Sequence, residues 1–198
     1  MVVGLGNPGR RYERTRHNAG FVVVERLAER WSIPADRKQS GALVGDGRIG
    51  DARVTLVRPQ SFMNLSGQPV RALMDFLKLE TPEIVVVHDE VDLPFGAVRC
   101  KQGGGHGGHN GLRDLNKHLG PDYLRVRVGV GRPPEGWDTA DYVLGTWAED
   151  EAPRVGELID GAADAVEHIL REGISSAMNR FNPRTSATRA TPATSSAG

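Results

Sequence analysis

The sequence predicts an α/β protein in which a twisted, mixed β-sheet lies between two layers of helices, a three-layer sandwich. Two observations lead to this prediction: short continuous apolar runs typical of buried parallel strands, and apolar residues at helical spacing in the segments between them. A chain of 198 residues can bury one hydrophobic core without disulfides or metals. We therefore expect a single domain over residues 1–183.

The central strands are expected from apolar runs at residues 2–3 and 84–88. Runs of this kind are typical of strands buried on both faces of a parallel sheet. Two further runs, 42–44 and 52–57, flank the segment Gly-Asp-Gly at 45–47, a composition that predicts a hairpin turn. An antiparallel hairpin beside parallel strands makes the predicted sheet mixed.

A last strand is expected over residues 124–130, where Leu and Val alternate with Arg125, Arg127 and glycines. Alternation with a period of two is typical of a strand with one buried face. The two arginines should therefore project together from the other face.

Helices are expected where apolar residues recur every three or four positions, over residues 21–31, 70–77 and 155–170. Ser66 precedes the second segment as its expected cap, and Gly173 lies at the expected end of the third. Each helix should pack its apolar face on the sheet.

Composition limits the classes of function. No apolar run approaches the roughly 20 residues that a membrane span needs, and residues 1–9 lack the pattern of a secretory signal, so we expect a cytosolic protein. Cys100 is the only cysteine, which excludes an internal disulfide or a multi-cysteine zinc site, and we assign it no role. Beyond Pro183 the chain has no apolar period, so residues 184–198 are predicted to be a disordered tail.

Basic residues cluster along the chain although the net charge is zero, with 25 basic and 25 acidic residues. This balance does not by itself indicate a nucleic-acid binder, and any one cluster can be ordinary solvated surface. The clusters are Arg10, Arg11, Arg14 and Arg16, then Arg99 and Lys101, then Arg125, Arg127 and Arg132.

A glycine pattern after the first strand raises the alternative of a dinucleotide site. Residues 4–9, Gly-Leu-Gly-Asn-Pro-Gly, match GxGxxG. A dinucleotide-binding turn leads directly into a helix, whereas here Pro8 and Gly9 continue into a loop and helical spacing resumes only after Asn18. The context argues against a nicotinamide-dependent oxidoreductase but leaves it as an alternative.

Polar residues interrupt the apolar framework at the ends of the predicted elements, where α/β proteins bind ligands. A histidine held by a carboxylate can act as a general base on water, and side-chain amides can stabilise an oxyanion. The sequence has no GxSxG nucleophile, so water is the expected nucleophile. The polar clusters are Asn7, His17-Asn18, Phe62-Met63-Asn64, His88-Asp89-Glu90, and a glycine-rich run at 103–111 that contains His109 and Asn110.

Each cluster also has an ordinary structural interpretation. His17 can be a capping or core histidine, and asparagines beside glycine or proline are common in turns. His88, Asp89, Glu90 and Asp92 could bind a metal, but their spacing matches no established metal motif. A catalytically silent RNA-binding module remains a further alternative.

The ordered set of motifs is more specific than any one of them. In chain order they are GLGNPG with Tyr12 after it, RHNAG at 16–20, PQSFMNLSG at 59–67, HDEVDLP at 88–94 and GGGHGGHNGL at 103–112. This set closely resembles the bacterial peptidyl-tRNA hydrolase family over residues 1–182, although the start looks a few residues short.

The resemblance implies an enzyme that cuts the ester bond between a peptide and its tRNA, as a monomer without metal or cofactor. It implies that His17 is the catalytic base, that Asp89 orients it and that Asn7 belongs to the catalytic group. It further implies that Asn7, Asn64 and Asn110 line the cleft that holds the scissile ester and the end of the peptide. Tyr12, Met63 and His109 are implied as further residues that bind the peptidyl-tRNA.

The resemblance also implies contacts outside the cleft. Arg99 and Arg127 would clamp the 5′ phosphate of the tRNA at the acceptor stem, a task that suits the arginine fork. Residues from about 138 to 155 resemble the family's mobile lid over the cleft.

Overall fold

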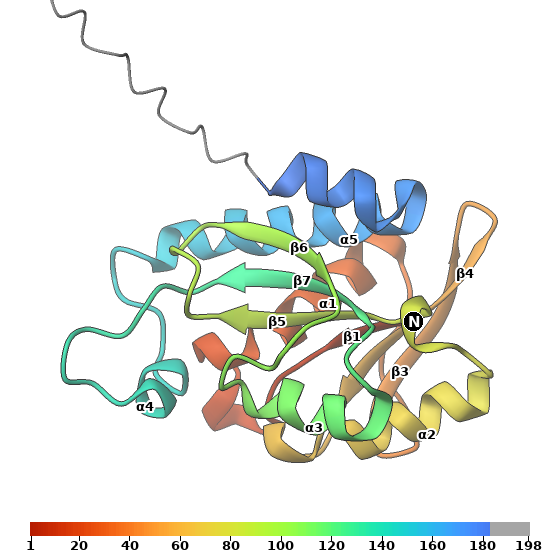
Figure 1. The fold of residues 1–198 in the computed structure, drawn as a ribbon, viewed down its shortest axis with the longest axis horizontal. Coiled ribbons are helices and arrows are strands. Elements are labelled where there is room, and N and C mark those ends of the chain that lie inside the picture. The colour runs from red at the N-terminus through yellow and green to blue at the C-terminus, as the bar shows by residue number, and fades with distance from the viewer. Residues whose placement is uncertain (183–198) are drawn as a thin grey trace, which may run out of the picture.

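The computed structural model describes residues 1–182, and the tail predicted for residues 184–198 lies outside the described residues. Along the chain, helices separate single strands or runs of two or three consecutive strands (Figure 1). The strands are β1 (Val2–Gly4), β2 (Arg37–Gln39), β3 (Ala42–Ile49), β4 (Ala52–Pro59), β5 (Val85–Glu90), β6 (Val98–Gln102) and β7 (Leu124–Gly129). The α-helices are α1 (Ala19–Trp31), α2 (Gly67–Leu77), α3 (Asn110–Leu119), α4 (Thr139–Val143) and α5 (Ala152–Phe181), and single 3₁₀ turns are η1 (Arg10–Tyr12), η2 (Arg16–Asn18), η3 (Met63–Leu65) and η4 (Thr81–Glu83).

The seven strands form one mixed sheet in the order β2-β3-β4-β1-β5-β7-β6, which confirms the predicted fold class. The four central strands β4, β1, β5 and β7 are parallel to one another. Antiparallel pairs complete both edges, β2 with β3 and β3 with β4 on one side, and β6 with β7 on the other. The carboxyl ends of the central strands therefore meet at one edge of the sheet.

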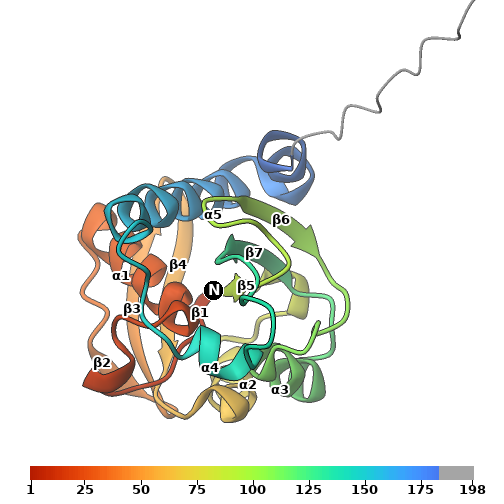
Figure 2. The ribbon, with the colours of Figure 1, turned by 90° about the vertical axis from the view of Figure 1, so that its left-hand side faces the viewer.

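Two hydrophobic clusters lie on opposite faces of this sheet. Alternate strand residues such as Val2 and Val126 pack with α1 and α5, whereas Val3 and Val86 pack with α2 and α3. Figures 1 and 2 show the resulting layers, with α5 above the sheet and α2 and α3 below it. Burial on both faces explains why the central strands are continuous apolar runs.

Glycines let α1 approach β1 closely. A Cβ at Gly4 would lie 2.1 Å from the carbonyl oxygen of Gly20, and a Cβ at Gly6 would lie 2.6 Å from the ring of Phe21. Gly4 and Gly6 therefore serve helix packing, and two 3₁₀ turns separate the glycine pattern from α1. A dinucleotide-binding turn leads directly into its helix, so the pattern does not support the oxidoreductase alternative. The same approach brings the residues just before α1 to the edge of the sheet.

The predicted hairpin exists, but its turn lies further along the chain than expected. Strand β3 continues through Gly45 and Gly47, and the chain turns at Gly50, which has a φ of 58°. Both earlier glycines are needed because residues 33–35 pass close by: a Cβ at Gly45 would meet the carbonyl of Pro34 at 2.4 Å. The prediction of a turn at 45–47 was wrong because close packing, not turning, requires these glycines.

Two helix ends also differ from the prediction. Ser66 does not cap α2 with its side chain, because its hydroxyl donates to the carbonyl of Met63 and the carboxylate of Asp114 accepts from the Gly67 amide instead. Gly173 breaks the last helix as expected, with a φ of 83°, but helical structure resumes and α5 ends at Phe181. No helix in the described part of the chain has the length and apolar character needed to cross a membrane.

Candidate active site

Polar side chains gather at the edge where the parallel strands end. Asn7 follows β1, Asp89 is the next-to-last residue of β5, and Asn64 follows β4. His17 lies in η2, which the close approach of α1 to β1 holds beside the same edge. This is the edge at which open α/β sheets bind ligands.

These residues line a cavity of about 780 Å³. Eight of the ten site residues expected from the sequence line it, and the two arginines Arg99 and Arg127 do not. The eight are Asn7, Tyr12, His17, Met63, Asn64, Asp89, His109 and Asn110.

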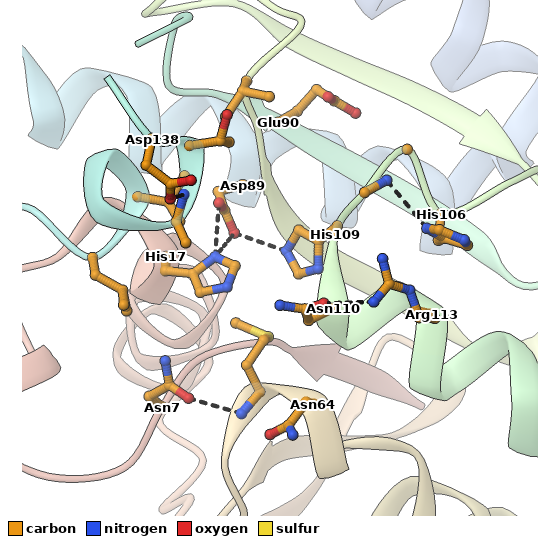
Figure 3. Close-up of a pocket in the computed structure, with 18 of the residues that line it drawn as sticks. Asn7, His17, Asn64, Asp89, Glu90, His106, His109, Asn110, Arg113 and Asp138 are labelled. Carbon is orange, nitrogen blue, oxygen red and sulfur yellow. Dashed lines mark hydrogen bonds and ion pairs between the residues drawn. The ribbon is translucent and has the colours of Figure 1, made fainter. Parts of the chain in front are cut away.

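His17 and Asp89 form a buried pair at the back of this cavity. The Nδ1 atom of His17 lies 2.9 Å from both carboxylate oxygens of Asp89, whose side chain is only 2% exposed. Because a carboxylate accepts hydrogen bonds, His17 carries its proton on Nδ1 and its Nε2 keeps a lone pair for a ligand. Figure 3 shows the free side of the ring turned into the cavity.

Electrostatics favour an ionised Asp89 and a basic His17. Burial raises the pKa of the Asp89 carboxyl, but the two histidines beside it outweigh burial and hold that pKa below its usual value. Burial lowers the pKa of the His17 imidazole, but the charge and hydrogen bond of Asp89 outweigh it and raise the pKa above its usual value. The pair is therefore suited to accept a proton at neutral pH.

His109 lies on the other side of the carboxylate. Its Nε2 is 2.9 Å from Oδ1 of Asp89, and its Nδ1 accepts hydrogen bonds from the amides of Gly111 and Leu112. His109 is thus the N-cap of α3, and Figure 3 shows the carboxylate between the two imidazole rings. The sequence analysis placed His109 among the substrate contacts and did not foresee this bond.

Asn7 is fixed by a second asparagine. Its side-chain Oδ1 accepts from the amide of Met63 at 2.7 Å, while Asn18 bonds both the amide and the carbonyl of Asn7. With Oδ1 occupied, the amide nitrogen of Asn7 is the group that faces the His17 side of the cavity (Figure 3). Asn18 was part of the polar cluster noted in the sequence, but its support of Asn7 depends on a contact across 11 residues.

The other expected contacts lie around the cavity mouth. Asn64 is exposed on η3, Met63 is buried beneath it, and Asn110 accepts a hydrogen bond from Arg113 at 3.1 Å. Tyr12 is partly buried, and the guanidinium of Arg11 lies 4.5 Å from its ring centroid. Phe62, which is 56% exposed, adds an apolar surface to the same mouth.

Helix α4 forms one wall of the cavity. Asp138, Val143 and Leu144 line it, so part of the segment 138–155 borders the cavity, and its action as a lid stays a prediction. The sequence did not indicate how this wall is held. Arg16, the neighbour of His17, bonds the carbonyl of Thr146 and stacks on the Tyr142 ring at 4.3 Å.

The arginines of the sheet lie outside the cavity. Arg99 and Arg127 are register partners on β6 and β7 and project from the face opposite α5, because Val126 and Val128 pack with that helix. Arg127 bonds Glu90, which does line the cavity. Arg125 lies on the same face but is buried and donates to the carbonyls of Gly104 and Gly105, so it supports the glycine-rich loop rather than an exposed basic face.

The described residues contain one cluster with ligand atoms close enough for a metal. His17, Asp89 and His109 offer ligand atoms within 4.8 Å of one another. Hydrogen bonds account for this cluster, because each ring directs an N–H at the carboxylate, so we assign no metal to it. His88, which the sequence analysis considered as a ligand, is fully buried beneath the site and donates to the carbonyl of Asp89.

Together these groups provide the parts of general-base hydrolysis. A base with a free lone pair lies beside donor amides, in a cavity large enough for an extended substrate. Among the described residues, Tyr12 and Thr139 are the hydroxyl side chains that line the cavity, and neither forms a hydrogen bond with His17. Water is therefore the nucleophile that the geometry favours.

Comparisons with known proteins point to one family. The family model described as peptidyl-tRNA hydrolase matches residues 1–190. The peptidyl-tRNA hydrolase of Nocardia farcinica is 52% identical over 184 residues, covering 92% of this chain and 95% of that protein, and that of Citrifermentans bemidjiense is 49% identical over 185 residues, covering 93% and 98%. The crystal structure of peptidyl-tRNA hydrolase from Acinetobacter baumannii has a TM-score of 0.86 at 40% identity, covering 91% of this chain and 93% of that chain.

Proposed function

Because this chain belongs to the peptidyl-tRNA hydrolase family and hydrolyses the ester bond between peptide and tRNA, we propose that His17 is the general base of that reaction. The observation that carries the proposal is the buried His17–Asp89 pair, with both carboxylate oxygens 2.9 Å from Nδ1, at the back of the cavity. Asp89 keeps the Nδ1–H tautomer and stabilises the imidazolium that forms.

The reaction follows from these positions. Nε2 of His17 takes a proton from water as the water oxygen attacks the ester carbonyl. The amide of Asn7 donates to the oxyanion of the tetrahedral intermediate. As the intermediate collapses, the bond to the ribose oxygen breaks and His17 returns its proton to that oxygen, releasing the peptide as a carboxylic acid and the tRNA with a free hydroxyl.

Substrate binding is assigned to the rest of the cavity. Asn64 and Asn110 offer amides at the mouth for the end of the peptide and the terminal nucleotide, and Tyr12 and Met63 add apolar contact. Arg99 and Arg127 would bind the 5′ phosphate at the acceptor stem, outside the cavity, where a long substrate continues over the sheet.

Two further properties complete the proposal. The protein acts as a monomer. It acts in the cytoplasm, where translation produces its substrate, and residues 138–155 act as a lid over the cleft.

Measuring peptide release from purified peptidyl-tRNA tests the role of His17. His17→Ala should lose at least about 100-fold in kcat, the usual contribution of a general base, while tRNA binding persists. His118→Ala, in the last turn of α3 and outside the cavity, is the matched control and should retain activity. Near-normal turnover by His17→Ala would reject the assignment, and binding without turnover by the unmodified protein would favour an RNA-binding module.

A further inference from the structure

The cap of α3 fixes which nitrogen of His109 carries the proton. Nδ1 lies 3.1 Å from the amide of Gly111 and 3.3 Å from the amide of Leu112, and both amides are donors. A ring nitrogen that accepts hydrogen bonds cannot carry a proton, so the proton of the neutral ring is on Nε2. The Nε2–H then points at Oδ1 of Asp89, 2.9 Å away.

The carboxylate of Asp89 is therefore shared. Its Oδ1 accepts from both His17 Nδ1 and His109 Nε2, and its Oδ2 accepts from His17 Nδ1 alone. The side chain is 2% exposed, so the two rings rather than solvent determine its orientation. The rings lie 4.8 Å apart between centroids and are tilted by 47°, and each ring directs one nitrogen at Oδ1 of Asp89, 2.9 Å away.

We propose that His109 is a positioning residue for Asp89: the first amides of α3 hold its ring so that Nε2–H fixes the carboxylate and takes up part of its negative charge. This inference rests on the proposed role of His17 as base. It differs from a substrate-binding role for His109, because the atoms that would face a ligand are committed to Asp89 on one side and to the helix on the other.

The sharing has a consequence for the strength of the base. A hydrogen bond donated to Asp89 by His109 reduces the attraction between the carboxylate and a protonated His17. Removing that donor should strengthen the attraction and raise the pH at which His17 loses its proton. Other charged or titratable groups around His17 remain unchanged by this substitution; they are Arg16 beside it in the chain, His88 beneath His109, and Glu90, Asp92, His106, Arg113 and Asp138 in the cavity wall.

His109→Asn separates the two tasks of this residue. Asparagine is one of the preferred N-cap residues, so α3 should still begin normally, but its shorter side chain cannot cap the helix and also reach Asp89. The acid limb of kcat/KM should move to higher pH by on the order of half a unit to one unit. His109→Ala should show the same shift with a lower Tm, because it also removes the cap. The matched control His118→Asn, in the last turn of α3, should leave the limb unchanged.

Nitrogen-15 NMR of the histidine side chains gives a readout that does not depend on activity. In the unmodified protein, the His109 ring should show a protonated Nε2 and an unprotonated Nδ1, and titration of His17 should shift upward in His109→Asn. A protonated Nδ1 on His109 would overturn the proposal. So would a His17 titration that stays in place, as expected if His109 only binds substrate, or one that moves to lower pH, as expected if Asp89 is merely misplaced. Failure of His17→Ala to lose activity would instead reject the proposed function.

Discussion

The guanidinium of Arg16 lies 2.6 Å from the carboxylate of Glu151, and the two side chains are only 7% and 15% exposed. Arg16 is the residue before His17, whereas Glu151 lies just before α5, at the far end of the segment that contains α4. The amide of Arg16 also donates to the carbonyl of Gly145, and Thr15 forms a bridge with Thr146. One wall of the cavity is thus attached to the turn that carries His17.

Replacing Arg16 with methionine should loosen this wall. The variant leaves the partly buried Glu151 without its ion-pair partner and removes the bond to Thr146. The free energy of unfolding, measured by urea denaturation, should therefore fall by about 3 kcal/mol. Amide hydrogen exchange over residues 139–147 should accelerate, and KM should rise more than kcat falls. Arg132→Met is the matched control, because its pair with Asp92 is largely exposed and should contribute no more than about 1 kcal/mol. Unchanged exchange in the Arg16 variant would show that other contacts hold the wall.

Asp89→Asn should change both the rate and its pH dependence. In the unmodified protein the rate should rise with pH through a pKa above the ordinary histidine value, because Asp89 stabilises the protonated His17 and only the neutral ring acts as base. The amide keeps the shape of the carboxylate but removes its charge, so kcat should fall and the acid limb should move to lower pH. The measurement is kcat and kcat/KM for peptide release from pH 5 to 9. Near-identical pH profiles for the variant and the unmodified protein would contradict the proposed His17–Asp89 pair.

His88 should make the fold sensitive to acid. Burial lowers the pKa of its imidazole to about 3. Below pH 6.5 the unfolded chain binds a proton on this residue that the folded chain does not, so the free energy of unfolding falls as the pH drops, at a slope that approaches about 1.4 kcal/mol per pH unit. His88→Gln removes this proton uptake, so between pH 6 and pH 4 the free energy of unfolding should depend on pH less steeply, by the slope that corresponds to about one proton. Urea denaturation at several pH values measures this slope. Equal slopes in the variant and the unmodified protein would contradict the prediction.

The sequence was informative where one physical requirement determined the pattern. Burial on both faces produced the apolar runs of the central strands, and polar residues at the ends of the predicted elements marked candidates for the site. The pairing of His17 with Asp89, 72 positions apart, was implied only by the family resemblance. Helix α3 was missed because its start is hidden in a glycine-rich run. Its buried Leu112, Leu115 and Leu119 have helical spacing and could have indicated it.

Other relationships depend on which side chain faces which after folding. Alternation predicted that Arg125 and Arg127 share a face, but only the path of the glycine-rich loop buries Arg125 and leaves Arg127 to pair with Glu90. The bond between His109 and Asp89 likewise requires both the start of α3 and the end of β5. Local patterns do not encode such contacts, because each partner alone has several ordinary roles.

The arginine pair on β6 and β7 should contribute to tRNA binding and not to chemistry. Arg99 and Arg127 are register partners outside the cavity, where phosphate contacts would supply affinity by releasing counterions. Replacing either with alanine should raise KM for peptidyl-tRNA and reduce the slope of log affinity against log salt by about one, with kcat at saturation little changed. A short ester substrate without the 5′ phosphate end should be cut equally by variant and parent. Arg53→Ala, an exposed charge change on β4, is the control for general electrostatics. If either arginine variant loses as much activity on the short substrate, that residue acts in folding or catalysis, and the phosphate contact must be sought among Arg10, Arg11, Lys101 and Arg113.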